Sequence, residues 1–468
     1  MMTTTDTPLD DKIDPQVLKT AMVLVVGALA VVFDTTIVSV ALHQLAVDLH
    51  ASVTTIQWVM TGYLLALGIA VPLSTWSLAR FGGKRVWMVS LAVFLIGSIG
   101  SSLAWGAGAL IGWRVLQGLG GGLMLPVMTT MIMQAAAGRA IGRTVTWVAL
   151  PALLGPILGP LVGGLIISHL SWRYMFWVNV PFCLIGLFLA WRYLEKEPTP
   201  QQFPRLDVWG LVAFAPGIAC VILALSNAGG EAGFAHADVL VPLTVGVVAL
   251  IVFALHALRT SLPLIDIRLL ATRSVGSSST VMFLSGFALY GAMLVLPLFY
   301  QEARGASALM AGIMLVPQGI GTLLSRQIAG PLTDTIGARM IATVGFLITA
   351  AATIPFCFAD AHSNAWVLAA FLVVRGIGLG AITMPVMTAS YVGLGRDAIA
   401  HSSVLTRTTQ QLGGSFGTAV LAVLLTSQGF HAAFWWATGF ALAATVLCVW
   451  LPGRKEVLEA AAAARRSA

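Results

Sequence analysis

Charged residues are scarce in this sequence. Only 9% of the 468 residues are Asp, Glu, Lys or Arg, whereas about a quarter is usual in a soluble globular domain. Hydrophobic residues make up 58% of the chain. Apolar runs of about twenty residues, each long enough to cross a hydrocarbon core about 30 Å thick, recur along almost all of it. The composition therefore excludes a water-soluble fold and leaves no room for a soluble catalytic domain.

Paired cysteines and catalytic motifs are also missing. The four cysteines, Cys183, Cys220, Cys357 and Cys448, fall inside apolar runs without a CxxC spacing. Neither a disulfide framework nor a metal cluster is expected from them. The eight histidines form no HExxH motif and no Ser/His/Asp arrangement. We therefore expect no enzyme, no catalytic residue, no metal, no organic cofactor and no nucleic-acid partner.

The apolar runs predict an all-α polytopic membrane protein. An even number of spans puts both termini on one side of the membrane. The first twenty residues, MMTTTDTPLDDKIDPQVLKT, lack the basic start and the small-residue cleavage site of a signal peptide. We expect fourteen spans, at residues 20–42, 55–78, 86–104, 108–134, 144–168, 174–192, 208–227, 238–257, 276–300, 308–327, 340–358, 365–390, 404–427 and 434–451.

Lysine and arginine are distributed very unevenly between the two sides of this arrangement. With a cytosolic N-terminus, 21 of the 25 lie in inside segments, only Arg173 and Arg304 lie outside, and Arg114 and Arg375 lie within spans. Inside loops of membrane proteins carry such an excess. The pattern supports the span count and predicts a bacterial inner-membrane protein with cytosolic ends.

An internal repeat relates the two ends of the chain. GLGGGLMLPVMT (Gly118 to Thr129) returns as GIGLGAITMPVMT (Gly376 to Thr388), and RFGGKR (Arg80 to Arg85) returns in TDTIGAR (Thr333 to Arg339). The matching elements are eight spans apart, which predicts two six-helix halves with two helices inserted between them. The expected units are a cytosolic tail 1–19, an N-terminal half 20–192, a linker with two additional helices 193–274, a C-terminal half 275–451 and a cytosolic tail 452–468.

Asp34 is the one acidic side chain, of eighteen, that lies well inside a predicted span. A charge there costs roughly 2.5–3.5 kcal/mol on insertion scales, so such a residue usually faces a cavity or a partner. The expected partner is Arg114 in the fourth span. A neighbouring arginine favours the charged carboxylate and burial disfavours it, so a change in their separation would change proton affinity. The alternative is a fixed ion pair that only holds two helices together.

GPILGPLVGG (Gly155 to Gly164) in the fifth span repeats glycine every four residues. The glycines expose a flat stripe for close helix packing, and the prolines delete backbone hydrogen bonds. We expect a hinge or gate helix; plain small-residue packing is the alternative. The residues concerned are Gly155, Pro156, Gly159, Pro160 and Gly163.

Two basic turns are expected at the cytosolic face. The first offers Arg80, Gly82, Lys84 and Arg85, and its repeat offers Asp334, Gly337 and Arg339. Asp334 is a candidate for pairing with basic neighbours or helix ends, which would latch one conformation. A solvated positive-inside loop is the simpler explanation.

The segment SWRYMFWVNVPF, Ser171 to Phe182, opens the sixth span on the outer side. Its five aromatic residues lie close in sequence to Arg173 and Asn179. Tyrosine and tryptophan collect at membrane interfaces. We therefore expect an interfacial aromatic belt here.

With these residues identified, the chain resembles the major facilitator superfamily, and within it the fourteen-helix drug/proton antiporters of the EmrB/QacA group. The resemblance rests on FDTTIVSVAL (Phe33 to Leu42), WRVLQGLGGG (Trp113 to Gly122), RTTQQLGGSFGTAV (Arg407 to Val420) and the glycine-proline motif, which looks like the signature of exporters in this superfamily. It implies that Asp34 and Arg114 are the proton-coupling residues. The first turn departs from the family pattern, with Thr75 and Ala79 where Gly and Asp are usual.

The resemblance implies proton-coupled efflux of drugs or other small amphipathic molecules by alternating access, through a cavity between the halves. Because only one acid lies in mid-membrane, neutral, zwitterionic or anionic substrates are easier to drive than dications. We expect a monomer whose partners are substrate, protons and membrane lipids. A dedicated exporter of one metabolite, such as an amino acid, sugar or siderophore, and a non-transporting membrane sensor stay open. Residues that line the cavity or equally serve packing are Gln57, Trp58, Tyr63, Gln117, Met124, Tyr290 and Gln318.

Overall fold

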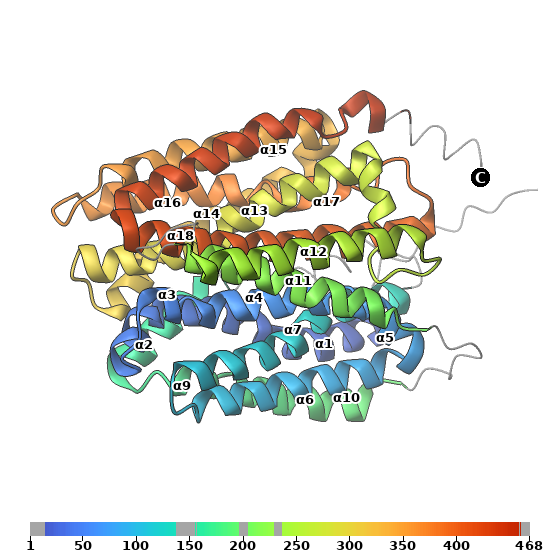
Figure 1. The fold of residues 1–468 in the computed structure, drawn as a ribbon, viewed down its shortest axis with the longest axis horizontal. Helices are drawn as coiled ribbons and strands as arrows, with labels where there is room; N and C mark the ends of the chain where they lie inside the picture. Colours follow the sequence, from blue (N-terminus) through green and yellow to red (C-terminus); the bar gives the residue numbers. More distant parts are fainter. Residues whose placement is uncertain are drawn as a thin grey trace, which may run out of the picture.

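The computed structural model describes residues 15–136, 155, 157–195, 205–228, 236–457 and 459. They form an elongated bundle of helices that run back and forth along one direction (Figure 1). No strand occurs in these ranges. In chain order the helices are α1 (Pro15–Ile37), α2 (Leu42–Asp48), α3 (Val53–Ile56), α4 (Trp58–Ala70), α5 (Leu73–Phe81), α6 (Gly83–Ser102), α7 (Ala107–Ala136), an unlabelled helix Ile157–His169, α9 (Tyr174–Trp177), α10 (Asn179–Tyr193), α11 (Val208–Asn227), α12 (Ala237–Arg259), α13 (Arg273–Leu298), α14 (Ala308–Ile336), α15 (Ala338–Thr353), α16 (Ala365–Gly380), α17 (Thr383–Ala389) and α18 (Arg396–Leu447).

In the described ranges, twelve helices are long and apolar enough to cross a membrane, compared with fourteen expected spans. The fifth expected span is described only in part, and its helix, Ile157–His169, is shorter than the others. The last two, 404–427 and 434–451, run together in α18, whose backbone breaks at Gly429 with φ of 83°. Each expected span therefore falls on helical chain where the structure describes it, and the fold is that of an all-helical membrane protein.

Two matching turns mark one end of the bundle. Gly82 follows α5 with φ 77° and ψ 156°, and Gly337 follows α14 with φ 91° and ψ 152°. Positive φ values favour glycine because it has no Cβ. The sequence repeat is thus also a repeat of backbone conformation. We call this end of the bundle the turn end.

The opposite end is called the bridge end because side chains of the two halves meet there. His43 Nδ1 at the end of the first span lies 3.1 Å from Glu302 Oε1, just after α13. Gln301 Nε2 donates a hydrogen bond of 2.9 Å to Val40 O. Both contacts join residues more than 250 positions apart in sequence.

Buried apolar side chains show that the halves are joined more closely at the bridge end than at the turn end. One cluster there contains Ile37 of α1 together with Phe299 and Phe434 of the second half. Toward the turn end each half has a main cluster of its own, around Trp87 in the first and Phe346 in the second, and two smaller clusters bring Leu65 and Ile69 of α4 against α18 and the inserted pair. Lipid is as apolar as these cores, so they stabilise the bundle mainly through close packing.

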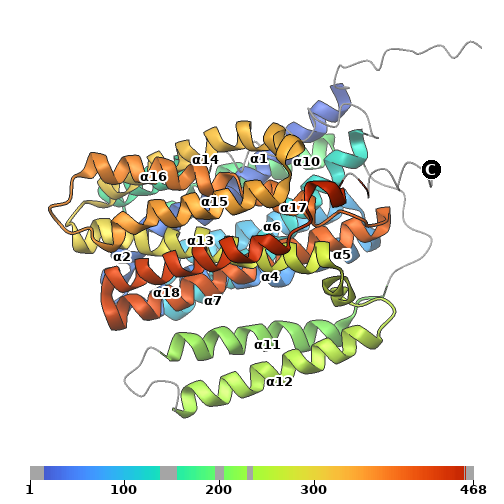
Figure 2. The same ribbon diagram turned by 90° about the horizontal axis from the view of Figure 1, so that it is seen from above.

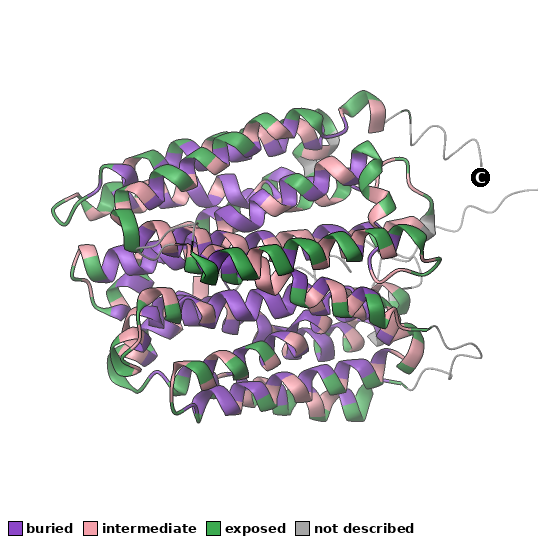
Figure 3. Ribbon diagram, in the orientation of Figure 1, coloured by how far each residue is buried: buried purple, intermediate pink, exposed green. Residues whose placement is uncertain are grey.

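The inserted pair, α11 and α12, lies beside the main bundle rather than within it (Figure 2). α11 contacts α4 of the first half and α18 of the second. α12 is mostly exposed (Figure 3), with only 17% of its apolar segment buried. Its exposed residues include Val241, Val248 and Ile251. An exposed apolar surface of this kind suits contact with lipid rather than water.

Asp207 fastens the inserted pair at the turn end. Its carboxylate accepts hydrogen bonds from Gly210 N (2.8 Å) and Leu264 N (3.0 Å) and lies 2.7 Å from His256 Nε2. Burial opposes ionisation of Asp207, but these hydrogen bonds outweigh it and hold its pKa below the usual value. The carboxylate therefore joins the start of α11, the end of α12 and the segment that leads to α13.

Candidate functional site

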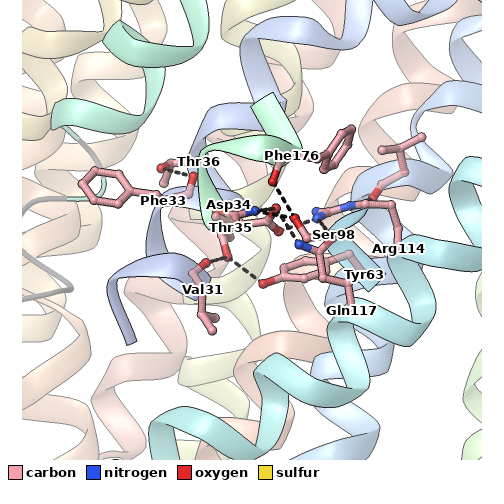
Figure 4. Close-up of polar contacts among 12 residues, drawn as sticks. Val31, Phe33, Asp34, Thr35, Thr36, Tyr63, Ser98, Arg114, Gln117 and Phe176 are labelled. Carbon is pink, nitrogen blue, oxygen red and sulfur yellow. Dashed lines mark hydrogen bonds and ion pairs between the residues drawn. The ribbon is translucent and has the colours of Figure 1, made fainter. Parts of the chain in front are cut away.

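Asp34 and Arg114 meet in the interior of the first half. Asp34 lies on α1 and is 0% exposed, and Arg114 lies on α7 and is 1% exposed. Arg114 Nη1 donates a hydrogen bond to Asp34 Oδ2 (Figure 4). Gln117 Nε2, one turn along α7, donates to Asp34 Oδ1 at 2.9 Å. The carboxylate is thus held by two donors from one face of α7.

Asn179 is a third donor to Asp34. Its Nδ2 atom lies 2.8 Å from Asp34 Oδ1 and 3.0 Å from Ser98 Oγ. Ser98 Oγ donates in turn to Phe176 O at 2.8 Å. The sequence placed Asn179 in an aromatic belt, yet the structure buries it at the start of α10. Its position within an apolar helix could have indicated a role in the interior, because a buried amide needs a hydrogen-bond partner.

Arg114 is oriented by more than the carboxylate. Its Nε atom donates to Val59 O at 3.1 Å, and its Nη1 atom donates to Gln117 Oε1 at 2.8 Å. The guanidinium carbon lies 3.9 Å from the centre of the Tyr63 ring. Such stacking and charge-assisted bonding fix a planar guanidinium in one orientation. The site is therefore a buried ion pair whose two members are both held by further hydrogen bonds.

A central cavity of about 190 Å³ lies between the two halves, next to this site. Its walls are largely apolar, with hydroxyl and amide groups from both halves, including Thr35, Thr36, Ser285 and Gln411. The described lining residues include no Asp, Glu, Lys, Arg or His. Thr35 Oγ1 lies 3.3 Å from the hydroxyl of Tyr63, so one hydroxyl contact separates the cavity from the ring that stacks on Arg114.

Of the seven residues proposed for the cavity, Tyr290 and Gln318 line it. The other five are outside its described lining. Tyr63 and Gln117 surround the ion pair instead, and Met124, fully buried, belongs to the apolar core of the first half.

Gln57 and Trp58 face the inserted pair rather than the cavity, which corrects their expected position. Gln57 Nε2 (3.0 Å) and Trp58 Nε1 (3.1 Å) both donate to Ser226 Oγ on α11. Thr61 Oγ1 donates to Gln57 Oε1 at 2.5 Å and lies 2.7 Å from Thr418 Oγ1 of α18. This polar junction joins both halves and the inserted pair, and it uses the groups that were expected to meet substrate.

The glycine-proline helix lies between the two halves. On the side of α1, a Cβ atom on Gly163 would lie 2.7 Å from Ile37 O, too close for any larger residue without movement. Gly155 and Gly159 make similar approaches to Val32 and Thr36. The stripe thus packs on the helix that carries Asp34.

The other side of this helix contacts α14 of the second half. A Cβ atom on Gly312 would overlap Pro160 O, and one on Gly164 would lie 2.6 Å from Ala308 O. Pro160 also lines the cavity. Pro156 lies outside the described residues. Close packing accounts for the glycines, and a hinge stays a prediction.

The basic turns fasten the last helix of each half. Lys84 Nζ donates to the carbonyl oxygens of Trp191 (2.8 Å) and Leu194 (2.5 Å) at the end of α10. In the second half, Arg339 Nε donates to Leu451 O at 2.7 Å, just after α18. Basic groups favour the unpaired carbonyls at helix C-termini.

The remaining members of the turns are Arg80, Arg85 and Asp334. Arg80 lies in the last turn of α5, and Arg85 is exposed at the start of α6. The side chain of Asp334 lies outside the described part of the structure, so the latch proposed for it stays a prediction.

The second half buries an arginine of its own on α16. Arg375 is 2% exposed and donates to Gln318 Oε1 (2.7 Å), Ala288 O (2.9 Å) and Thr353 Oγ1 (3.2 Å). All three acceptors are neutral. The ion pairs found among the described residues do not include Arg375.

Comparisons with known proteins match this architecture. The model of the Major Facilitator Superfamily matches residues 24–277 and 278–467. The Multidrug resistance protein B homolog of Mycobacterium tuberculosis is 35% identical over 424 residues, 90% of this chain and 78% of that protein. The Lincomycin resistance protein LmrB of Bacillus subtilis is 29% identical over 400 residues, 85% of this chain and 83% of that protein. A solved D-xylose-proton symporter has a TM-score of 0.70 at 16% identity, covers 94% of this chain and 99% of its own, and shows the fold alone.

Repeated helical halves around a central cavity, with a buried ion pair beside it, define a multi-pass membrane transporter rather than an enzyme. The family match covers nearly the whole chain. The chain therefore belongs to the major facilitator superfamily, as its resemblance to that family had indicated.

Proposed function

We propose that this transporter exports drugs or other small amphipathic molecules in exchange for protons, by alternating access. Relatives named for multidrug and lincomycin resistance support the substrate class. The observation that carries proton coupling is Asp34, a buried carboxylate beside the cavity whose negative charge is balanced by Arg114. Protonation would remove that balance and change how α1 is held against α7.

Asn179 offers a way to hold the protonated acid. Its Oδ1 atom is buried and has no hydrogen-bond partner among the described residues, while its Nδ2 atom donates to Asp34. A protonated carboxyl group becomes a donor. Rotation of the amide by half a turn would then let Asn179 accept from Asp34. The same side chain is suited to both protonation states.

The helix Ile157–His169 is the proposed mechanical link between the proton site and the second half. It packs against α1 through Gly163 and against α14 through Pro160 and Gly164. A shift of α1 that follows protonation of Asp34 would press on backbone atoms with no side chains between to absorb it. We infer that this close packing transmits the shift to the contact between the halves.

We propose that the turn end and both termini face the cytosol of a bacterium, and that the protein lies in its inner membrane. The excess of lysine and arginine at the turn end supports this orientation. The halves share the large apolar cluster at the bridge end, whereas the main clusters toward the turn end belong to one half each and smaller clusters, such as Leu65 with Ala419, cross between the halves. In this orientation the structure corresponds to the state closed to the outside.

The driving force is sufficient for concentrative export. A proton that crosses 100 mV gains about 2.3 kcal/mol, and one pH unit adds about 1.4 kcal/mol. A neutral substrate exchanged for one proton can therefore be concentrated about 500-fold. For a monovalent cation the electrical contributions cancel, and only about tenfold remains.

The test is efflux of a fluorescent dye from cells and from proteoliposomes with an imposed pH gradient, with and without a protonophore. We expect Asp34→Asn to abolish active efflux. Asp48→Asn is the matched control, because Asp48 is exposed at the end of α2 and contacts Gln44 rather than the cavity. Undiminished gradient-driven efflux in Asp34→Asn would rule out Asp34 as the coupling site.

A dedicated exporter of one compact metabolite is the second candidate. The cavity of about 190 Å³ favours it, because pockets for drug-sized ligands usually measure about 300–1,000 Å³. A growth-inhibition panel with the gene deleted and overexpressed separates the two. Resistance to several unrelated compounds supports broad export, and a change for one metabolite alone supports the dedicated exporter.

A further inference from the structure

Arg375 is a buried cation that has no carboxylate partner in the described part of the chain. Its three hydrogen bonds end on an amide, a backbone carbonyl and a hydroxyl. In the sequence, Asp34 is the only acidic residue well inside a predicted span, and it is already paired with Arg114. A buried charge normally has an opposite charge beside it. We therefore expect the opposite charge for Arg375 to come from a bound molecule rather than from the chain.

The guanidinium lies directly behind the wall of the central cavity. Gln318, which accepts from Arg375 Nη1, is itself a lining residue of that cavity. A second void of about 10 Å³ touches Arg375 and shares Ala292 and Leu296 with the central cavity. One amide and the side chains of α13 thus separate the charge from the space that a substrate would occupy.

The surroundings do not cancel this charge. The described cavity lining has no charged side chain. The ion pair of Asp34 with Arg114 is neutral as a unit. In a site with few water molecules, an isolated charge acts over a longer range than it does in water. Arg375 therefore contributes a positive potential within the cavity.

We propose that Arg375 and Gln318 form a subsite for an anionic group, a carboxylate above all, on the amphipathic substrate. The amide oxygen of Gln318 occupies the place that one substrate oxygen would take. A carboxylate that displaces it would form a charge-assisted and bidentate contact with the guanidinium. This inference rests on the proposed transport function, because it names the substrate class of the same cavity.

The anion would also suit the proposed exchange. One proton moving inward and one monovalent anion moving outward transfer charge in the direction that a negative cell interior favours. A cation would lose this advantage. The position of Arg375 and the energetics of exchange therefore select the same class of substrate.

The test uses two probes with one aromatic body, pyrenebutyrate and pyrenebutylammonium, and the purified full-length protein without any gradient. Binding is measured as energy transfer from the fourteen tryptophans to pyrene. We expect the anion to bind at least about tenfold more tightly than the ammonium compound. Equal affinity, preference for the ammonium compound, or no binding of either overturns the proposal.

Three variants locate the effect. Gln318→Glu supplies an internal carboxylate beside Arg375, and we expect it to reverse the preference in favour of the ammonium probe. Gln318→Met also removes the amide but adds no charge, so it should keep the preference for the anion. Arg375→Gln should remove that preference, because it weakens binding of the anion and relieves the repulsion of the ammonium probe. Wild-type selectivity in correctly folded Gln318→Glu, checked by gel filtration and thermal unfolding, contradicts the assignment.

The outcome is separable from that of the transport experiment. If Asp34→Asn keeps full gradient-driven efflux while the anion preference is present, proton coupling at Asp34 fails and the subsite stands. If Asp34→Asn stops efflux but the two probes bind equally, the coupling site stands and the subsite fails.

Discussion

The two halves bury an arginine in corresponding helices and balance its charge differently. Aligned on the glycine-rich repeat, Arg375 falls at the position of Gln117, one turn from Arg114 and on the same face of the helix. In the first half the guanidinium meets a carboxylate. In the second, the acceptors found among the described residues are all neutral. The repeat thus keeps the backbone plan, while the first half buries an ion pair and the second buries an arginine among neutral acceptors.

The difference has a direct thermodynamic consequence, because removing one member of a buried ion pair leaves the other charge unpaired. We expect Arg114→Gln to destabilise the protein by about 3–5 kcal/mol. Adding Asp34→Asn should recover most of this loss. Arg375→Gln strands no opposite charge, so its effect should be about 1 kcal/mol, the size of a hydrogen bond. Thermal and denaturant unfolding of the purified variants measures all three, and equal losses for the two arginines would remove the contrast between the halves.

The amide that supports Asp34 provides a smaller and more local test. Asn179→Ala deletes a hydrogen bond to an ionised group, which is worth about 1.5–3 kcal/mol. Its counterpart in the second half, Thr353→Ala, deletes a hydrogen bond from the charged Arg375 and should cost a similar amount, about 1.5–3 kcal/mol. We also expect Asn179→Ala to shift the pH dependence of efflux, whereas Thr353→Ala should leave it in place. Parallel pH profiles for both variants would count against a special role for Asn179.

The packing of the glycine-proline helix distinguishes its two neighbours. Gly163→Ala brings a methyl group against Ile37 O of α1, and Gly312→Ala brings one from α14 against Pro160 O. Overpacking of this kind costs about 1–3 kcal/mol. Gly108→Ala on α7 is the control, since nothing lies within 4 Å of the added Cβ. If proton coupling runs from α1 to α14 through this helix, both variants should lose more efflux activity than their loss of thermal stability explains. Efflux and thermal unfolding are measured for each variant and for the Gly108→Ala control.

How far the sequence predicts this site depends on which physical rule applies to each residue. A charge inside a span demands a partner, so the ion pair of Asp34 and Arg114 could be predicted from composition and span positions alone. The repeated turns at Gly82 and Gly337 could be predicted too, because a tight reversal needs a residue without a Cβ. Asn179 could not be predicted as a partner of Asp34, because a neutral amide among aromatic residues is equally expected at the membrane interface.

The cavity could not be predicted with the same success, and lipid is the reason. Helices in a membrane are apolar on the side that faces lipid as well as on the side that faces the core, so periodicity does not reveal which side chains point inward. Gln57 and Trp58 were assigned to the cavity from their span, but α11 covers that face and Ser226 takes their hydrogen bonds. Tyr290 and Gln318, which line the cavity, have no stronger signal in the sequence.

The smallest expected effect concerns Lys84 and Arg339 of the two turns. Each donates hydrogen bonds to carbonyl oxygens at the end of the last helix of its half. Lys84→Ala removes two hydrogen bonds to the end of α10, and Arg339→Ala removes one to Leu451 O and a contact of 3.8 Å with Glu456. A basic group at a helix C-terminus is worth about 0.3–1 kcal/mol when partly exposed. We therefore expect similar losses of that size, weaker at high salt, in thermal unfolding of either variant. A much larger loss for Arg339→Ala would mean that the second half depends on this turn in a way that the first does not, and the likeness of the halves would then be limited to their backbone.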